Sequence, residues 1–323
     1  MSQQPILRDQ DLQHAFTEQG FAVVTLYTPE EAAAIRAVIA DYIPAEPSIN
    51  DPQDGMYNST FDQDLKNRIP EQVEAQLLLR LESMMLGYRG IGACVLAKVA
   101  NAERLRIHQH QPVTPDIFTQ VMLCWLTLDD VDADSGALRL VPRSQMILRH
   151  IQSFTSPPFF ADFEQELESE LAEFVPMRAG QAILMDWSML HGSCPNHRDR
   201  PALRISATLV PEEQPFCILA ESPGNVFDAY AIDGKTVDPE LLCMCGGSLE
   251  GLEPKGRLDN RNTTLTRSEF ESLLRLNQRI APGYDPIDAV RAGTAAANSN
   301  PATAWIRALG KTFRRNKETA HSA

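Results

Sequence analysis

The chain has 323 residues, of which 43% are hydrophobic and 22% charged, and its formal net charge is −14. This balance is typical of a globular protein with a buried core, and the negative charge disfavours a nucleic-acid partner. No apolar run reaches the length of a membrane span, and the first residues lack a secretory signal pattern. The six cysteines are scattered through segments typical of a reduced protein, so we expect a cytoplasmic location without a membrane partner.

The amino-terminal part alternates helical and strand patterns. A capping box at Thr28 and Glu31, with Pro29 in the first turn, predicts the start of one helix. In chain order we expect a helix, a strand, a second helix, a long polar loop and a third helix, over residues 12–20, 21–26, 29–42, 44–70 and 71–88.

From about residue 91, short β-type runs alternate with turn signals. Many short strands at such spacing are typical of an antiparallel sandwich or barrel. An acidic amphipathic insertion interrupts them at 162–173. The expected strands cover residues 93–99, 104–110, 119–128, 137–142, 182–187 and 202–210.

The carboxy-terminal part has a different pattern. After Pro211 the strand signals fade, and one helix is predicted over 267–280. Residues 215–290 carry apolar groups that need burial, so we expect a lid across the barrel mouth or a homodimer contact. Residues 291–303, rich in Ala, Gly, Asn and Ser, predict a flexible linker before a basic, solvated tail. The expected division is a core with its amino-terminal helices and a carboxy-terminal extension, at residues 1–214 and 215–323.

Two of the seven histidines, His108 and His110, lie two residues apart on the strand expected over 104–110. Side chains at this spacing share one face of a strand and can converge on one metal ion. His191 follows another expected strand and precedes a glycine. A close pair with a distant third ligand is the layout of the facial triad of non-haem iron sites, which leaves coordination positions open. For each histidine alone the alternative is a packed core residue, and Asp186 is the alternative carboxylate ligand.

Three segments carry a resemblance to a known family. They are FTEQGFAVVTLYTPEEAAAIRAVI, LCWLTLDDVDADSGALRLVPRSQM and VPMRAGQAILMDWSMLHGSCPNHRDRP. Over about residues 8–211 the chain resembles the phytanoyl-CoA dioxygenase-like family of Fe(II)/2-oxoglutarate oxygenases. The resemblance implies a mainly β fold with flanking helices, namely a double-stranded β-helix (a jelly roll, cupin-like). It also implies Fe(II), 2-oxoglutarate and O₂, with hydroxylation of a small-molecule substrate as the default reaction.

The resemblance assigns metal ligands, with one departure. His108 and His191 match the two histidines of the family, whereas His110 stands where the family usually has an aspartate. Imidazole is also an iron ligand, but it is neutral and leaves the iron site one unit more positive. The related halogenases have a small residue at this position that leaves room for a halide, so the bulk of His110 disfavours halogenation.

A second departure concerns the arginine that holds the far carboxylate of 2-oxoglutarate. The usual position of this arginine holds Ala202, with Arg200 and Arg204 two residues to either side. Arg204 and Ser206 match the Arg-x-Ser pair of many such oxygenases, so we favour them and keep Arg200 as the second candidate. The alternative is that both arginines are surface residues of an edge strand. Two further candidate contacts to the co-substrate are Ser193, in the His-Gly-Ser segment, and Lys98, for which a surface position is equally compatible.

Two other functions stay open. His110 and Ala202 favour an iron dioxygenase that binds its substrate directly at three histidines without 2-oxoglutarate. A non-catalytic partner subunit would keep the barrel and lose tight iron binding. Formation of succinate from 2-oxoglutarate distinguishes the 2-oxoglutarate-dependent oxygenase from the first alternative. Tight iron binding distinguishes it from the second.

Overall fold

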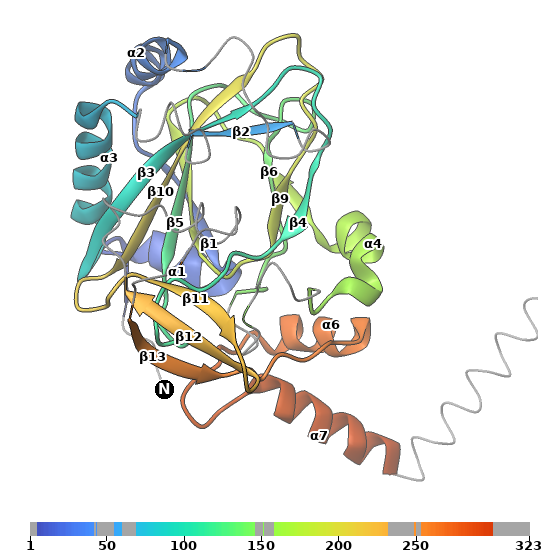
Figure 1. Cartoon of the computed structure of the whole chain (residues 1–323). Helices are drawn as coiled ribbons and strands as arrows, with labels where there is room; N and C mark the ends of the chain where they lie inside the picture. The colour runs from blue at the N-terminus through green and yellow to red at the C-terminus, as the bar shows by residue number, and fades with distance from the viewer. Residues whose placement is uncertain are drawn as a thin grey trace, which may run out of the picture.

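A computed structural model describes residues 5–41, 43, 55–59, 69–145, 151, 158–231, 249 and 253–299. Two antiparallel sheets face each other, as expected for a double-stranded β-helix (Figure 1). The larger sheet has the strand order β1 (Phe21–Thr25), β8 (Gln181–Asp186), β5 (Met122–Thr127), β10 (Ala202–Pro211), β3 (Tyr88–Lys98) and β2 (Met56–Asn58). The smaller has the order β4 (Leu105–His108), β9 (His191–Ser193), β6 (Leu138–Leu140) and β7 (Glu173–Val175).

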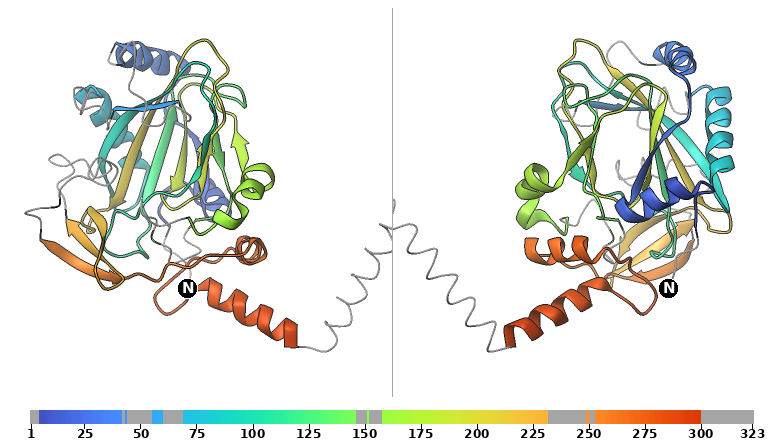
Figure 2. Two further views of the ribbon diagram at one scale, coloured as in Figure 1. Left: turned by 45° about the vertical axis from the view of Figure 1, so that its right-hand side comes forward. Right: turned by 180° about the vertical axis from the view of Figure 1, so that it is seen from behind.

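Three amino-terminal helices flank the larger sheet on its outer side (Figure 2). They are α1 (Gln10–Gln19), α2 (Pro29–Ala40) and α3 (Glu71–Met84). The capping box predicted for α2 is confirmed: the Glu31 backbone N–H donates to Thr28 Oγ1 at 3.2 Å, and the Thr28 N–H donates to Glu31 Oε2 at 2.8 Å. Helix α3 ends four residues before the predicted end, because β3 already begins at Tyr88. The expectation of a mainly β fold with flanking helices is confirmed.

The two faces of the larger sheet bury different side chains. Alternate residues of a strand point to opposite faces. On β5, Cys124 packs among the helices with Phe16 and Leu77, whereas Trp125 packs between the sheets with Leu138 of β6. The interior of the barrel is therefore bounded by both sheets.

The expected loss of strands after Pro211 is wrong. A three-stranded antiparallel sheet follows, with β11 (Cys217–Ser222), β12 (Val226–Ala231) and β13 (Pro254–Asp259), and then α6 (Arg267–Leu276). This sheet and α6 lie across one end of the barrel, at the bottom of Figure 1. Strands β11 and β12 form a hairpin around residues 223–225, whereas β13 is distant in the chain and its pairing with β12 is not reported by a local pattern.

The linker expected over 291–303 is also wrong in its described part, because α7 (Pro286–Ser299) covers it up to Ser299. Alanine favours helix, and Pro286 stands at the first helical position, where proline is well tolerated. The Asp285 carboxylate accepts the Ile287 N–H at 3.1 Å and so caps the helix. The basic tail lies outside the described residues. Among the helices that the structure describes, none is long and apolar enough to cross a membrane.

The carboxy-terminal elements are packed on the barrel. Phe270 and Leu273 of α6 share a buried cluster with Ile107 on β4 and with Leu190, which precedes β9. The backbone N–H of Cys217 donates to the Val113 carbonyl at 2.8 Å. These contacts connect the extension to the segments that carry the three histidines.

We expect a chain that ends after Pro211 to aggregate, because Ile107 and Leu190 would lose their apolar cover. A chain that ends after Arg291 keeps the buried Ile287 and serves as the control, which is expected to stay soluble and to unfold cooperatively. Light scattering and thermal unfolding of the two truncated proteins measure the difference. A soluble, cooperatively folded 1–211 fragment would show that the core needs no cover.

Candidate metal centre

The three histidines predicted as ligands come together. One ligand atom from each of His108, His110 and His191 lies within 4.8 Å of the others. The ring centroids are 4.4 Å apart for His108 and His191, 4.6 Å for His110 and His191, and 5.5 Å for His108 and His110. Strand pairing explains part of this geometry, since His108 on β4 is directly opposite His191 on β9.

The placement of His110 differs from the expectation. Strand β4 ends at His108, so the two histidines are not on one strand. His110 belongs to the segment after the strand, and its ring makes an edge contact with Trp187, at 4.4 Å between centroids. The three side chains still converge, but the position of His110 does not follow from strand periodicity.

Hydrogen bonds and charge suit the three imidazoles to a metal ion. Nδ1 of His108 lies 3.0 Å from the Arg106 carbonyl oxygen, and Nδ1 of His191 lies 2.8 Å from that of Met189. A ring that donates from Nδ1 carries no proton on Nε2, and this is the tautomer that binds a metal through Nε2. Burial, followed by the neighbouring His108, lowers the pKa of His191 to about 3.

His110 provides a further sign of a cation site. Burial, and next the neighbouring His191, holds its pKa well below the usual value, so the ring is neutral at neutral pH. Its buried Nδ1 has no hydrogen-bond partner among the described residues. A buried polar atom without a partner is unfavourable unless a missing group completes it. The donor set therefore fits Fe(II), for which imidazole is a suitable ligand.

Arg204 is the second unusual group. It lies on β10, is fully buried, and donates from one terminal nitrogen to the carbonyl oxygens of Gly136 at 2.6 Å and Ser135 at 3.3 Å. Its Nε and its other terminal nitrogen have no partner among the described residues, and it forms no ion pair there. Its Cζ lies 4.7 Å from the centre of the Trp125 ring. Burial lowers the pKa of Arg204 to about 9, which marks a cation that lacks a close anion.

Three other residues are candidates for the co-substrate contact. The Ser193 hydroxyl, two residues from His191 on β9, is buried without a hydrogen-bond partner among the described residues. Ser206 is two residues from Arg204 on β10, on the same face, opposite Trp125. Lys98, at the end of β3, is fully buried, so its interpretation as a surface residue is wrong.

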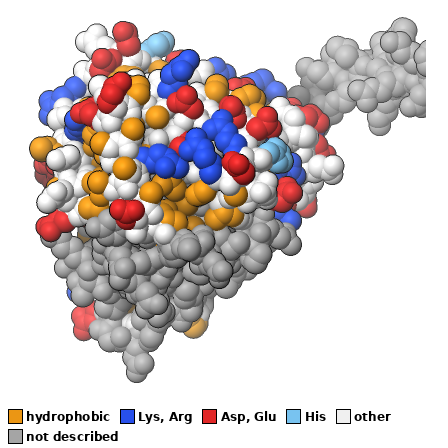
Figure 3. All heavy atoms as spheres, turned by 90° about the horizontal axis from the view of Figure 1, so that it is seen from above, with side chains coloured by type: hydrophobic (Ala, Val, Ile, Leu, Met, Phe, Trp, Pro, Cys, Tyr) orange, Lys and Arg blue, Asp and Glu red, His pale blue; other side chains and the backbone are white. Residues whose placement is uncertain are grey.

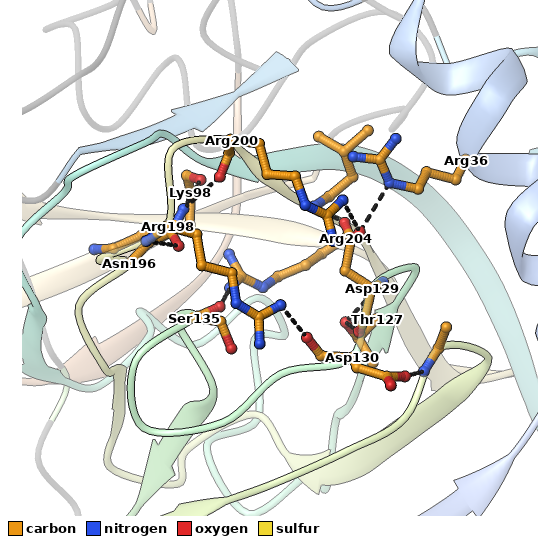
Figure 4. A network of polar contacts seen from close by, with 12 residues as sticks. Arg36, Lys98, Thr127, Asp129, Asp130, Ser135, Asn196, Arg198, Arg200 and Arg204 are labelled. Atoms are coloured by element: carbon orange, nitrogen blue, oxygen red, sulfur yellow. Dashed lines mark hydrogen bonds and ion pairs between the residues drawn. The ribbon is translucent and has the colours of Figure 1, made fainter.

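Arg200 is placed differently. It precedes β10, its side chain is 53% exposed, and it pairs with Asp129 at 2.9 Å. Asp129 also pairs with Arg36 of α2 at 2.9 Å, so Arg200 belongs to a polar network at the end of the barrel (Figure 4). The geometry thus favours Arg204 over Arg200 as the anchor.

Seen from that end of the barrel, basic and acidic side chains are mixed on the surface (Figure 3). A nucleic-acid-binding face is typically uniformly basic instead.

Sequence reasoning missed Glu168, which lies in the acidic insertion. The insertion folds as η2 (Ala161–Phe163), α4 (Glu164–Glu166) and η3 (Leu167–Leu171). Glu168 is buried, accepts the Ile107 backbone N–H at 2.7 Å, and pairs with Arg139 of β6. It therefore fixes the backbone next to His108. An acidic surface helix gives no local sign that one carboxylate turns inward.

We expect Glu168→Gln to lower the free energy of unfolding by about 3 kcal/mol, because Arg139, whose side chain is only 13% exposed, loses its charge partner. Urea unfolding measures this loss. Glu166→Gln, in α4 of the same insertion, is the control and is expected to change stability by less than about 0.5 kcal/mol. Equal stability of the two variants would show that the Glu168 pair is not stabilising.

A family model and several solved structures are similar to this chain. A model of the phytanoyl-CoA dioxygenase (PhyH) family matches residues 16–203, more than half of the chain. The solved structures that are similar include two enzymes of nogalamycin biosynthesis, both non-haem and α-ketoglutarate-dependent. The carbocyclase SnoK has 16% identity and a TM-score of 0.51, over 66% of this chain and 89% of that one. The epimerase SnoN has 18% identity and a TM-score of 0.50, over 78% of this chain and 95% of that one.

At such identity the two structures show a shared fold. No curated protein sequence matches the chain significantly. The family match covers the end of α1, helices α2 and α3, both sheets up to the start of β10, and all three histidines. The chain belongs to the phytanoyl-CoA dioxygenase family of Fe(II)/2-oxoglutarate-dependent oxygenases.

Proposed function

We propose that the protein is an Fe(II)- and 2-oxoglutarate-dependent oxygenase that oxidises a small molecule, with hydroxylation as the default outcome. Fe(II) is held by His108, His110 and His191, and the far carboxylate of 2-oxoglutarate is held by Arg204. The observation that carries the proposal is the guanidinium of Arg204, which is fully buried with two nitrogens unpartnered among the described residues. A buried cation of this kind is costly unless an anion completes it.

The residues around Arg204 suit a carboxylate. Its two free nitrogens, Nε and Nη1, lie on different edges of the guanidinium, so each can donate a separate charge-assisted hydrogen bond to an anion beside it. The Ser193 hydroxyl and Ser206 provide further donors from β9 and from β10 itself. Trp125 beside Arg204 and Trp187 beside His110 belong to one buried cluster between the sheets, so the anchor and the metal ligands border the same interior.

The roles of the chain are binding, orientation and exclusion of water. Three neutral imidazoles bind the metal without neutralising its charge, so the bound co-substrate supplies the negative charge of the site. The apolar side chains between the sheets, with Trp125 and Leu138 among them, keep the interior dry. When bound, Fe(II) supplies the activation of O₂ that is coupled to decarboxylation of 2-oxoglutarate.

Formation of succinate from 2-oxoglutarate tests the proposal. The iron-loaded protein is expected to convert 2-oxoglutarate to succinate in the presence of O₂, and His191→Ala is expected not to. His110 favours a second candidate, an iron dioxygenase that binds its substrate at the three histidines directly. O₂ consumption that continues without 2-oxoglutarate and yields no succinate would replace the first function by the second.

The type of oxidation that the substrate undergoes is measured separately. The similar structures bear the names of a carbocyclase and an epimerase, so the fold accommodates more than one oxidative outcome. Product mass distinguishes them, because hydroxylation adds one oxygen atom, ring closure removes two hydrogens, and epimerisation leaves the mass unchanged. We expect the addition of one oxygen.

A further inference from the structure

His110 lies beyond the end of β4, so the sheet does not fix it as it fixes His108 and His191. We propose that Trp187 and the carboxy-terminal sheet, acting through Gln111, are positioning groups that hold His110 on the metal. The inference rests on the proposed function, since it assigns a role toward the same metal. It gives the carboxy-terminal extension, which lies beyond the family match, a part in the metal centre.

Trp187 holds His110 in two ways. Its ring makes the edge contact with the His110 ring described above. Its indole N–H donates to the carbonyl oxygen of Gln111, the next residue, at 2.7 Å. Trp187 itself is 7% exposed, and its backbone N–H donates to the Val121 carbonyl at 2.9 Å. One buried side chain therefore restrains both the ring of His110 and the backbone that follows it.

The carboxy-terminal sheet holds the same segment from the other side. The Gln111 side-chain amide donates to the carbonyl oxygen of Leu219 on β11. Two residues further on, the Val113 carbonyl accepts the Cys217 N–H at 2.8 Å. Leu219 is fixed in turn by its pairing with Ala229 of β12. The segment after His110 is thus bound to an ordered sheet at two points.

A second link joins the extension to the turn that carries Trp187. Asp186, at the end of β8, is buried and accepts from the Ser188 backbone N–H at 3.0 Å. Its other oxygen pairs with Arg279, which follows α6. The turn between β8 and β9 contains Trp187 and ends at His191. The ion pair between Asp186 and Arg279 therefore lets the extension restrain this turn. Docking of the extension and the geometry of the metal site depend on shared contacts.

The expected effect follows from the general behaviour of groups that orient metal ligands. Loss of one such partner costs about 10–100-fold in metal affinity. We therefore expect Gln111→Met and Trp187→Phe each to weaken Co(II) binding about 10-fold in the full-length protein. Trp187→Phe removes the indole donor and keeps an aromatic ring. Arg261→Gln is the control, because its exposed pair with Asp259 of β13 does not face His110.

The test is a double-mutant cycle on Co(II) affinity, with the ligand-field absorption spectrum of bound Co(II) as a second readout. If Gln111 acts through His110, Gln111→Met is expected to have no further effect in a His110→Ala protein. The spectrum of Gln111→Met is expected to shift toward that of His110→Ala, while Arg261→Gln keeps the wild-type spectrum and affinity within twofold.

Two results would overturn the inference, and they are distinguishable. Additive losses in the cycle, with an unchanged spectrum, would show a general loss of stability and leave the metal site proposal standing. A wild-type protein that binds no Co(II) and no Fe(II) would overturn the metal site proposal and the positioning role together. Trp187→Phe gives an independent cycle if Gln111→Met does not fold.

Discussion

Replacing either His108 or His191 with alanine is expected to abolish stoichiometric Fe(II) binding. Each change removes one of three ligands whose atoms lie within 4.8 Å of one another. We expect affinity to fall more than about 100-fold, because loss of a group that only orients a ligand already costs about 10–100-fold. Anaerobic titration with Fe(II) or Co(II) measures the loss. His197→Ala, which changes an exposed histidine near β9, is expected to bind as the wild type does.

The same titration separates the roles of His110. His110→Ala is expected to weaken binding strongly, since its ring converges with the other two. His110→Asp places at this position the carboxylate that is usual in the family and is expected to retain the metal. Unchanged affinity in His110→Ala would remove His110 from the ligand set and leave a site with two histidines.

Arg204→Ala is expected to raise the apparent dissociation constant for 2-oxoglutarate roughly 30-fold or more. Truncation of one partner of a buried charge pair costs about 2–5 kcal/mol, and about 1.4 kcal/mol corresponds to tenfold. Arg200→Ala is the matched control, because its half-exposed side chain is paired with Asp129 and is expected to matter little. Calorimetric titration of the metal-loaded, anaerobic protein measures both. Equal, small effects would show that neither arginine is the anchor.

Replacing Arg204 is expected to leave the stability of the ligand-free protein unchanged or to raise it, although it weakens binding of 2-oxoglutarate. Arg204 is buried without an ion pair among the described residues, so Arg204→Met exchanges an uncompensated cation for an apolar side chain of similar length. We expect the melting temperature of ligand-free Arg204→Met to equal or exceed that of the wild type, and its stabilisation by 2-oxoglutarate to be lost. A large destabilisation would assign Arg204 a structural role.

Local sequence signals predicted the parts of the fold that local chemistry determines. The capping box at Thr28 sets the start of α2 as expected, and α1 ends before Gly20, the last residue of the range expected for it. The family segments indicated the barrel and His191, and the spacing of His108 and His110 indicated the other two ligands. The sequence favoured Arg204 over Arg200 through the Arg-x-Ser pair, but the burial of Arg204 and the ion pair of Arg200 with Asp129 appear only after folding.

The carboxy-terminal extension shows why the rest could not be predicted. Strands β11 to β13 are stabilised by one another and by the barrel, so their residues carry little periodic pattern of their own. Ala-rich residues before Ser299 suggested a linker, yet the cap at Asp285 and the burial of Ile287 make them helical. Glu168 and Gln111 act through contacts with residues far away in the chain. Such contacts appear only when the chain is folded.

The central claim is that three histidines and Arg204 together hold Fe(II) and 2-oxoglutarate. A crystal structure of the full-length protein, grown without oxygen in the presence of both, tests it most directly. The account predicts one metal ion bound by nitrogen atoms of His108, His110 and His191, with 2-oxoglutarate on the metal and its far carboxylate on Arg204. A metal ion that His110 does not touch, or a co-substrate carboxylate held by Arg200 instead, would contradict it.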